Sequence, residues 1–375
     1  MAKIAILDNN VSSIISMRKR IILDLQEKGH EIIIYTTGNA QNLNTAHDIG
    51  LKIIDVGSSV TNPVDIFKYM LRLKNEFKKF KPDICLTFTI RPAIWGNIVT
   101  RQLGIPTITN ITGIGPLFEK KNVAYRGARL LYKFVLSKTA KIFFQNDEDM
   151  QLFLANKFTT ADRVIKVPGS GVDHSYFSPV EKIASNEKFH FLFISRLVKD
   201  KGIMEFLECT NLLRKEYNDI EFTVIGPYWT QNLKANTITE SELQVWIDKG
   251  NITYLGEKKD VRPYIANTDC VVLPSYREGT SNVLLESCSM ERPCITCNVT
   301  GCKEIVEHNY NGFLCEPKNV PSLFEAMKKM YLLPAEKRLE MGKNGRKKMI
   351  KEFDKQIVIN AYVDAINQII HSKVK

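Results

Sequence analysis

Two glutamates eight residues apart are the clearest candidates for chemistry in this 375-residue chain. Glu278 and Glu286 lie in PSYREGTSNVLLE, which follows an apolar strand-like run and continues through a tight turn into a helix-like run. In open α/β sheets, ligands bind at the carboxyl ends of strands, so we expect Glu278 to lie in such a loop. Eight residues is close to a whole number of helical turns, which places Glu286 below it on the same side. The two carboxylates could accept hydrogen bonds from two hydroxyl-bearing parts of one ligand.

The residues between the two glutamates add a site for an anion. The first turn of a helix has backbone N–H groups without intrahelical partners, and these groups bind phosphate readily. The residues expected at this position are Gly279, Thr280, Ser281 and Asn282. Carboxylates for hydroxyl groups beside amides for phosphate indicate a sugar nucleotide as the ligand.

A basic pair, Arg196 and Lys201, brackets the turn after another strand-like run at residues 191–195. A nucleoside diphosphate leaving group gains negative charge as a glycosidic bond breaks. Fixed cations at that point stabilise the transition state more than the ground state. Arginine can hold a diphosphate through two hydrogen bonds, whereas lysine acts as a point charge.

Short β-branched runs alternate with helix-like segments along the chain, which predicts parallel, doubly wound sheets. In the first half we expect strands at residues 3–7, 30–36, 51–56, 83–88, 106–111, 141–145 and 163–167, and helices at 16–28, 63–80, 93–103, 122–137 and 147–156. In the second half we expect strands at 190–195, 221–225, 252–255, 269–273 and 294–298, and helices at 203–216, 240–249, 262–266, 282–290, 320–331, 334–352 and 355–370.

A stretch rich in Gly, Ser and Pro separates the two alternating regions and predicts a linker. We therefore expect two Rossmann-like α/β domains facing across a cleft, at residues 1–168 and 187–354, joined by a linker at 169–186. The C-terminal helix, at about 355–375, is expected to pack back onto the first domain.

Composition narrows the class of protein. A hydrophobic content of 44% with 25% charged residues is typical of a globular chain. No apolar run approaches the about 18 residues of a membrane span, and the N-terminus does not resemble a signal peptide, so we expect a cytosolic protein. Residues 1–168 carry 24 Lys and Arg against 14 Asp and Glu, a net charge of +10, whereas the remainder carries +1. A basic half suits an anionic membrane surface or nucleic acid, and charge alone does not separate these partners.

Eight cysteines raise the question of a metal site. The closest-spaced set contains Cys294 and Cys297, which lie in a run that has the pattern of a buried strand. A zinc site usually takes four ligands in two pairs, and the chain has no second C-x-x-C. We therefore expect these cysteines to be small core residues, with no bound metal.

Four motifs in chain order resemble the retaining glycosyltransferases of family 4, which have the two-domain fold called GT-B. The resemblance covers essentially the whole chain and is strongest between about residues 165 and 320. The motifs are Gly171-Val172-Asp173 followed by Phe177, Arg196 with Lys201-Gly202, the pair Glu278 and Glu286, and Asn309-Tyr310-Asn311-Gly312-Phe313-Leu314.

Two further segments, 87–92 and 110–115, resemble a subgroup that assembles bacterial surface polysaccharides such as O-antigen and capsule. Its members extend undecaprenyl-diphosphate-linked sugars, commonly from UDP-hexoses or UDP-N-acetylhexosamines. The resemblance implies an acceptor-binding N-terminal domain and a nucleotide-sugar-binding C-terminal domain. It also implies a protein at the inner face of the cytoplasmic membrane.

The resemblance also implies roles for individual residues. Glu286 binds the ribose hydroxyls, and Glu278 contacts the transferred sugar without acting as a nucleophile, since Glu286 is committed to ribose. In the front-face substitution usually assigned to this family, the departing phosphate oxygen deprotonates the acceptor hydroxyl. Arg196 and Lys201 hold the diphosphate, so no metal or other cofactor is expected. Gly226 and Val261 are expected near the nucleotide.

The N-terminal domain departs from the family pattern. Serines replace a glycine pair near the phosphates, and no histidine stands where many relatives contact the transferred sugar, so Thr89 or Arg91 is a possible substitute. Gly113 and Gly115 allow close backbone approach to the acceptor diphosphate, or form an ordinary tight turn. The candidate residues on this side are Ser12, Ser13, Arg91, Thr112, Gly113 and Gly115.

Two segments that mix basic and apolar residues, 67–80 and 125–138, could face an anionic membrane; an amphipathic helix with a solvated basic face is an equal alternative. Two other functions stay open. A UDP-N-acetylglucosamine 2-epimerase has the same fold and needs no acceptor platform. A basic nucleic-acid-binding protein would use the charged half, although no helix-turn-helix, zinc finger or RNP-like strand is present in the sequence.

Overall fold

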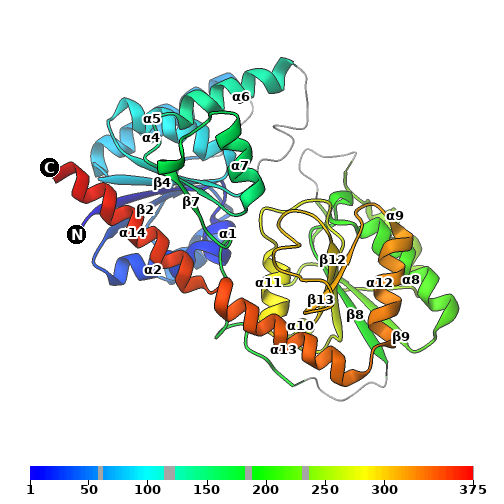
Figure 1. Cartoon of the computed structure of the whole chain (residues 1–375). Coiled ribbons are helices and arrows are strands. Elements are labelled where there is room, and N and C mark those ends of the chain that lie inside the picture. The colour runs from blue at the N-terminus through cyan, green and yellow to red at the C-terminus, as the bar shows by residue number, and fades with distance from the viewer. Residues whose placement is uncertain (58–61, 114–122, 182–187, 230–235, 375) are drawn as a thin grey trace. The chain divides into compact units, whose positions relative to one another are not determined.

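A computed structural model describes residues 1–57, 62–113, 123–181, 188–229 and 236–374 (Figure 1). The chain forms two compact units. Unit 1 comprises Met1–Ser170 with Gln356–Lys375, and unit 2 comprises Gly171–Lys355. The segment expected as a linker is thus divided: residues 171–181 belong to unit 2, where Val172 forms a β-bridge with Asp354.

Unit 1 is built on a seven-stranded parallel sheet with the order β3-β2-β1-β4-β5-β6-β7. Its strands are β1 (Lys3–Leu7), β2 (Glu31–Thr36), β3 (Ile53–Asp55), β4 (Ile84–Phe88), β5 (Thr107–Ile111), β6 (Lys141–Phe144) and β7 (Val164–Lys166). The central strands β4 and β5 are buried along their whole length, which explains their continuous apolar and threonine-rich sequences.

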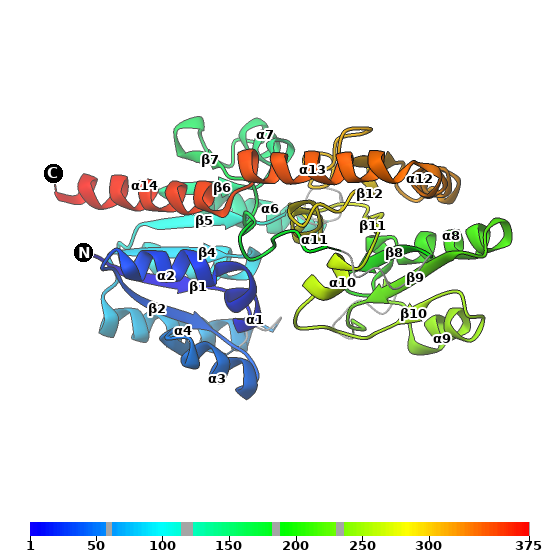
Figure 2. The ribbon, with the colours of Figure 1, turned by 90° about the horizontal axis from the view of Figure 1, so that it is seen from below.

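Helices cover this sheet (Figures 1 and 2). They are α1 (Val11–Ser13), α2 (Lys19–Glu27), α3 (Ala40–Asp48), α4 (Pro63–Phe80), α5 (Asn97–Gln102), α6 (Val123–Leu136), α7 (Asp147–Ala155) and α14 (Lys355–Val374), with the π-helical turns η1 (Ile14–Arg18) and η2 (Pro92–Gly96). Helix α14 shares a core with β1 and α2, in which Ile4, Leu25 and Ile366 are buried. The last helix of the chain thus belongs to unit 1.

Unit 2 has a six-stranded parallel sheet with the order β10-β9-β8-β11-β12-β13. Its strands are β8 (Phe189–Ile194), β9 (Ile220–Ile225), β10 (Thr253–Tyr254), β11 (Cys270–Leu273), β12 (Cys294–Cys297) and β13 (Gly312–Cys315). Its helices are α8 (Ile203–Glu216), α9 (Glu240–Asp248), α10 (Arg262–Ala266), α11 (Asn282–Ser289), α12 (Val320–Leu332) and α13 (Ala335–Glu352). The predicted fold class, two doubly wound parallel α/β sheets, is confirmed.

Local sequence signals explain several boundaries. Helix α4 has the Asn62 side chain as its N-cap and Pro63 in its first turn, and Lys81 ends it in the left-handed region. Helix α9 begins with a capping box between Thr239 and Glu242. These signals are carried by the residues themselves, so the corresponding helices agree closely with those expected from the sequence.

The sequence prediction missed two elements. Helix α3 is mostly polar and buries Ala46 alone, so it lacks an apolar stripe. Strand β13 is short and begins at Gly312, within a segment that has the composition of a turn. The helix expected at 16–28 also begins earlier, at Val11, and passes through the π-helical turn η1.

Each sheet reverses its winding direction at its first strand. In unit 2, β8 lies between β9 and β11, and in unit 1, β1 lies between β2 and β4. The connections after the two adjacent strands go to opposite faces at such a point, which leaves a crevice at the carboxyl ends where ligands bind. The residues that follow β8 and β11 are therefore the first place to look for a site in unit 2.

No helix in the described ranges is both long enough and apolar enough to cross a membrane.

Candidate active site

An ion pair joins the two loops at the crevice of unit 2. The ammonium of Lys201, in the loop after β8, donates to Oε1 of Glu278, in the loop after β11. The two side chains are only 15% and 14% exposed, so the pair is largely screened from bulk water. The sequence predicted both residues separately, and the order of the strands brings them together.

Glycines allow the loops to approach. Gly202 follows Lys201 with a φ of 73°, and a Cβ there would overlap the carbonyl of Pro274. Gly301, with a φ of 81°, lies against the backbone of Glu278 in the same way. Both glycines adopt the left-handed conformation and leave no room for a side chain.

Helix α11 begins at Asn282, four residues after Glu278, with Ser281 as its N-cap. The N–H of Ser281 donates to the carbonyl of Gly301 at 3.1 Å, so the prediction of a free amide at Ser281 is wrong. The physical reason is the close approach of the Gly301 loop. Asn282 is the first residue of the helix, and Gly279 and Thr280 lie in the loop just before it, where the Thr280 hydroxyl donates to the Gly279 carbonyl at 2.9 Å.

Glu286 lies in the second turn of α11 and is half-buried. Burial raises the pKa of its carboxyl group to about 8, and the nearby charge of Lys355 opposes this shift. No hydrogen-bond or ion-pair partner of the Glu286 carboxyl group is found among the residues that the structure describes. A carboxyl group of this kind can accept hydrogen bonds from a diol, and it ionises more readily once it does so.

Arg196 stands apart from the ion pair in the described part of the chain. It is exposed at the end of β8, and its guanidinium lies 4.5 Å from the ring centroid of Trp229, in the loop after β9. Stacking on an aromatic face fixes the plane of a guanidinium while its N–H groups stay available. Trp229 was not predicted from the sequence.

Gly226 and Val261 lie at the same edge of the sheet. Gly226 follows β9 with a φ of 145°, and its N–H donates to the Gly256 carbonyl at 2.9 Å. The Tyr254 hydroxyl donates to the Gly226 carbonyl at 2.8 Å. Val261 precedes α10 and accepts hydrogen bonds from the first turn of that helix. The loops after β8, β9, β10 and β11 thus all carry predicted donor-site residues.

In unit 1, both predicted serines are already engaged. The Ser13 hydroxyl donates to Asp8 at 3.1 Å, so the expectation that it donates to a phosphate conflicts with its position. The Ser12 hydroxyl accepts from Asn42 at 2.7 Å. Asp8 is buried, which raises its pKa to about 6 despite the charge of Arg18. These groups fix the loop after β1.

The loop after β4 carries backbone strain. Thr89 has a φ of 68°, which is rare for a β-branched residue, and its buried hydroxyl has no hydrogen-bond partner among the described residues. Arg91, two residues later, is half-buried and immediately precedes the π-helical turn η2. Thr112 and Gly113 follow β5, and Gly115 lies outside the described residues.

A hydrogen bond that the sequence did not reveal joins the two segments that carry the ion pair. The Tyr276 hydroxyl donates to Oε1 of Glu205 at 2.6 Å. Tyr276 is two residues before Glu278, and Glu205 is four residues after Lys201. Proximity to the two motifs is the only sequence signal for these residues.

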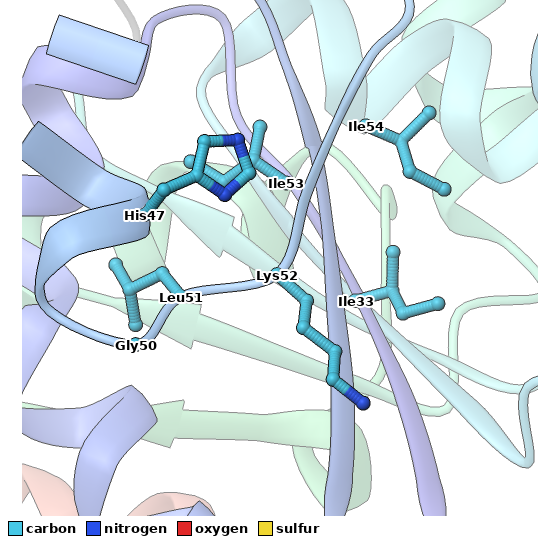
Figure 3. A pocket seen from close by; sticks show the side chains of 7 residues that line it. All are labelled: Ile33, His47, Gly50, Leu51, Lys52, Ile53 and Ile54. Atoms are coloured by element: carbon cyan, nitrogen blue, oxygen red, sulfur yellow. The ribbon is translucent and has the colours of Figure 1, made fainter. Parts of the chain in front are cut away.

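Two hollows on the described surface lie away from these loops. One of about 430 Å³ is lined by Ile33, His47, Gly50, Leu51, Lys52, Ile53 and Ile54 (Figure 3). It lies at the amino end of β3 and is mainly aliphatic, so it lacks the convergent polar groups of a catalytic site. A second hollow, of about 330 Å³, lies beside α10, where Arg262 stacks on Tyr176 at 3.8 Å.

All eight cysteines are buried. The Cys288 and Cys294 sulfur atoms lie 3.7 Å apart, as do those of Cys297 and Cys315. Burial raises the pKa of the Cys294 thiol, which is a property of core cysteines. Among the described residues, no group of three or more His, Cys, Asp or Glu is arranged to hold a metal ion.

Comparison with known families gives matches over both units. Residues 178–348 match the family described as glycosyl transferases group 1, and residues 3–146 match the family described as glycosyl transferase 4-like. The matches include the loops that carry Lys201, Glu278 and Glu286.

Two similar proteins have names that describe transfer to sugars linked to undecaprenyl diphosphate. The chain is 23% identical, over 98% of its length and 99% of the other protein, to N,N'-diacetylbacillosaminyl-diphospho-undecaprenol alpha-1,3-N-acetylgalactosaminyltransferase of Campylobacter jejuni. It is 28% identical, over 76% of each chain, to UDP-Gal:alpha-D-GlcNAc-diphosphoundecaprenol alpha-1,3-galactosyltransferase of Escherichia coli.

Solved structures share the fold. A glycosyltransferase from Rickettsia africae superposes with a TM-score of 0.80 and 17% identity, over 98% of both chains. The HepE protein of Anabaena, solved in complex with UDP and glucose, gives a TM-score of 0.78 and 16% identity over 98% of this chain and all of its own. At these identities the similarity establishes the fold alone.

The raised pKa of Glu286 predicts a pH-dependent affinity for a UDP-sugar. In the role expected from the sequence, Glu286 accepts hydrogen bonds from ribose hydroxyls, and these favour the ionised carboxylate. Binding would then release a proton, and the affinity should rise with pH until about pH 8. Calorimetry with UDP-glucose should give about tenfold weaker binding at pH 6 than at pH 7. Below its pKa, the ionised fraction of the Glu286 carboxyl group falls about tenfold for each pH unit. In Glu286→Gln this dependence should disappear; an equal slope in that variant would show that another group titrates.

Proposed function

Because the chain belongs to the glycosyltransferases of GT-B fold, with family matches over residues 3–146 and 178–348, we propose the following reaction for it. The enzyme transfers a hexose or N-acetylhexosamine from a UDP-sugar to an undecaprenyl-diphosphate-linked saccharide, with retention of the anomeric configuration. The product extends a surface polysaccharide such as O-antigen or capsule. The names of the Campylobacter and Escherichia relatives support this substrate class.

The observation that carries the proposal is the contact between Lys201 and Glu278 at the crevice of unit 2. It combines a fixed cation for a diphosphate with a carboxylate for sugar hydroxyls, where ligands bind in such sheets. Glu286 lies on the helix that starts from the same loop, and we assign it to the ribose hydroxyls. We assign donor binding to unit 2 and acceptor binding to unit 1.

In the proposed reaction the bond between the anomeric carbon and the β-phosphate oxygen breaks. The acceptor oxygen bonds to the same face of that carbon, and its proton passes to the departing phosphate oxygen. Lys201 and Arg196 stabilise the charge that builds on the diphosphate. Glu278 orients the sugar hydroxyls and supports the positive charge that develops on the ring.

The same cations make a metal unnecessary in the proposal. Lys201, Arg196 and the N-terminal turn of α11 supply positive charge to the diphosphate, the task that a divalent ion performs in other nucleotide sites.

We further propose that unit 1 docks on anionic lipid at the inner face of the cytoplasmic membrane. Phe67 and Leu71 of α4 are 67% and 49% exposed, and Leu130 and Phe134 of α6 are 69% and 57% exposed. Helix α5 contacts both α4 and α6 (Figure 1), and its Arg101 lies 4.5 Å over the Phe134 ring. The exposed basic residues on these two helices are Lys68, Arg72, Lys78, Lys79 and Arg126. Each basic residue near an anionic membrane contributes about 1 kcal/mol, so this surface suffices for reversible docking.

The central experiment mixes the protein with a panel of UDP-sugars and short lipid-diphosphate glycans, and resolves products by mass and anomeric NMR. We expect transfer with retention, and about 100-fold lower kcat in Glu278→Gln, because a group that stabilises the transition state is worth about this much. Glu208→Gln, an exposed glutamate on α8, is the matched control. Epimerisation of UDP-N-acetylglucosamine at C2 without an acceptor would instead indicate a 2-epimerase. No reaction with any donor would refute the proposal.

Transfer should be fully active in excess EDTA, because the charge on the diphosphate is met by Lys201, Arg196 and backbone groups. Initial rates with and without EDTA, on protein passed over a chelating resin, check this. Loss of activity that Mg²⁺ or Mn²⁺ restores would contradict the metal-free proposal.

Flotation with vesicles tests the docking surface. The wild type should float with phosphatidylglycerol-containing vesicles and remain behind with neutral phosphatidylcholine vesicles. The double variant Phe67→Ser, Phe134→Ser should lose most of this binding. A matched control replaces two exposed leucines of unit 2, Leu332→Ser and Leu339→Ser, and should float like the wild type. Equal losses in both variants would contradict the proposed surface.

A further inference from the structure

A hydrogen bond between Tyr276 and Glu205 links the same two segments that carry Glu278 and Lys201. The Tyr276 hydroxyl donates to Oε1 of Glu205 at 2.6 Å, the short distance expected for a hydroxyl that donates to a carboxylate. Burial and the neighbouring Glu205 carboxylate raise the pKa of Tyr276 above its usual value, so the hydroxyl keeps its proton. The bond joins the first turn of α8 to the loop between β11 and α11.

Other contacts show that the two segments are fitted closely to each other. The Asp200 carbonyl accepts from the Tyr276 N–H at 2.9 Å and from the Ser275 hydroxyl at 3.3 Å. The Lys318 ammonium lies over the Tyr276 ring, 4.9 Å from its centre. Tyr276 is therefore held by its backbone N–H, by one face of its ring and by its hydroxyl group.

The Tyr276–Glu205 bond is poorly explained as a device for stability. Oε2 of Glu205 is buried and has no hydrogen-bond partner within the described parts of the chain. A buried, unpartnered polar atom costs free energy, and two apolar side chains of similar shape would avoid this cost. The presence of this polar pair therefore favours a role in fixing the relative position of the two segments, because a hydrogen bond is directional and an apolar contact is not.

We infer that Tyr276 and Glu205 are positioning residues that keep the loops of Lys201 and Glu278 in register during transfer, an inference that rests on the proposed function. Lys201 and Glu278 contact each other in the structure, but in the proposed reaction Lys201 binds the diphosphate and Glu278 binds the sugar. Their ion pair therefore cannot fix the distance between the loops at that stage. The Tyr276–Glu205 bond lies outside the ion pair and remains intact when it opens.

Three variants separate positioning from stability. Tyr276→Phe removes the hydroxyl donor and leaves neither Glu205 carboxylate oxygen with a hydrogen-bond partner in the parts of the chain that are described, so we expect a lower Tm. We also expect about tenfold lower kcat, since small misplacements in an active site reduce rates by tenfold or more. Adding Glu205→Leu removes both polar partners, so the double variant should recover Tm but not kcat. Glu205→Gln keeps an acceptor for the tyrosine and should retain kcat within about threefold.

The matched control is Tyr331→Phe, which removes another tyrosine–carboxylate hydrogen bond of unit 2, to Asp219 at 2.7 Å, and should leave kcat unchanged. Recovery of both Tm and kcat in the double variant would overturn the inference, as would a Glu205→Gln variant as slow as Tyr276→Phe.

A second readout does not require turnover. Amide hydrogen exchange in residues 274–281 should be faster than in the wild type in Tyr276→Phe and in the double variant, and unchanged in Tyr331→Phe. Unchanged exchange in the first two would overturn the inference even if the wild type proved inactive as a transferase. An inactive wild type with faster exchange in these variants would refute the proposed reaction alone and leave the structural link established.

Discussion

The site in unit 2 depends on one constraint, the position of β8 between β9 and β11 in a parallel sheet. All carboxyl ends face one edge of such a sheet, and at the strand where the winding reverses the neighbouring loops separate. The loops after β8 and β11 therefore present Lys201 and Glu278 to each other, although 77 positions separate these residues in the sequence. The glycines at 202 and 301 then allow the backbones to come close enough for the side chains to meet.

Charge balance follows from this geometry. Lys201 and Glu278 neutralise each other where water is largely excluded, and burial favours the uncharged form of Glu286. A sugar nucleotide offers each group a better partner: phosphate for the lysine and hydroxyl groups for the carboxylates. In our proposal, the charges of Lys201 and Glu278 balance each other before the donor binds, and groups of the donor balance them afterwards. The Tyr276–Glu205 link is suited to this exchange because it involves neither member of the ion pair.

Unit 1 has a corresponding crevice between β1 and β4, with different contents. Polar side chains there bind mainly to one another: Ser13 to Asp8, and Arg18 to Ser170 at 2.9 Å. The strained backbone of Thr89 and the π-helical turns η1 and η2 follow the two strands that border this crevice. Departures from regular helix geometry are frequent at functional sites, which supports acceptor binding by this unit. Ser12 and Ser13, where the sequence departs from the family pattern, hydrogen-bond to neighbouring side chains of the same unit.

The sequence by itself determined the fold class and the elements with strong local signals. Helix α8 and helix α10 begin and end at the expected residues, because apolar periodicity and flanking glycine or proline act within a few positions. It also supplied the motif residues Lys201, Glu278 and Glu286, since their types and spacing are local properties. Helix α3 and strand β13 escaped because one is almost wholly polar and the other short and turn-like. Only the tertiary structure decided which side chains meet. The engaged amide of Ser281, the stacking of Arg196 on Trp229 and the bond from Tyr276 to Glu205 all join segments that follow different strands. Such contacts depend on strand order and on the space beside glycines, which no local pattern of residues encodes.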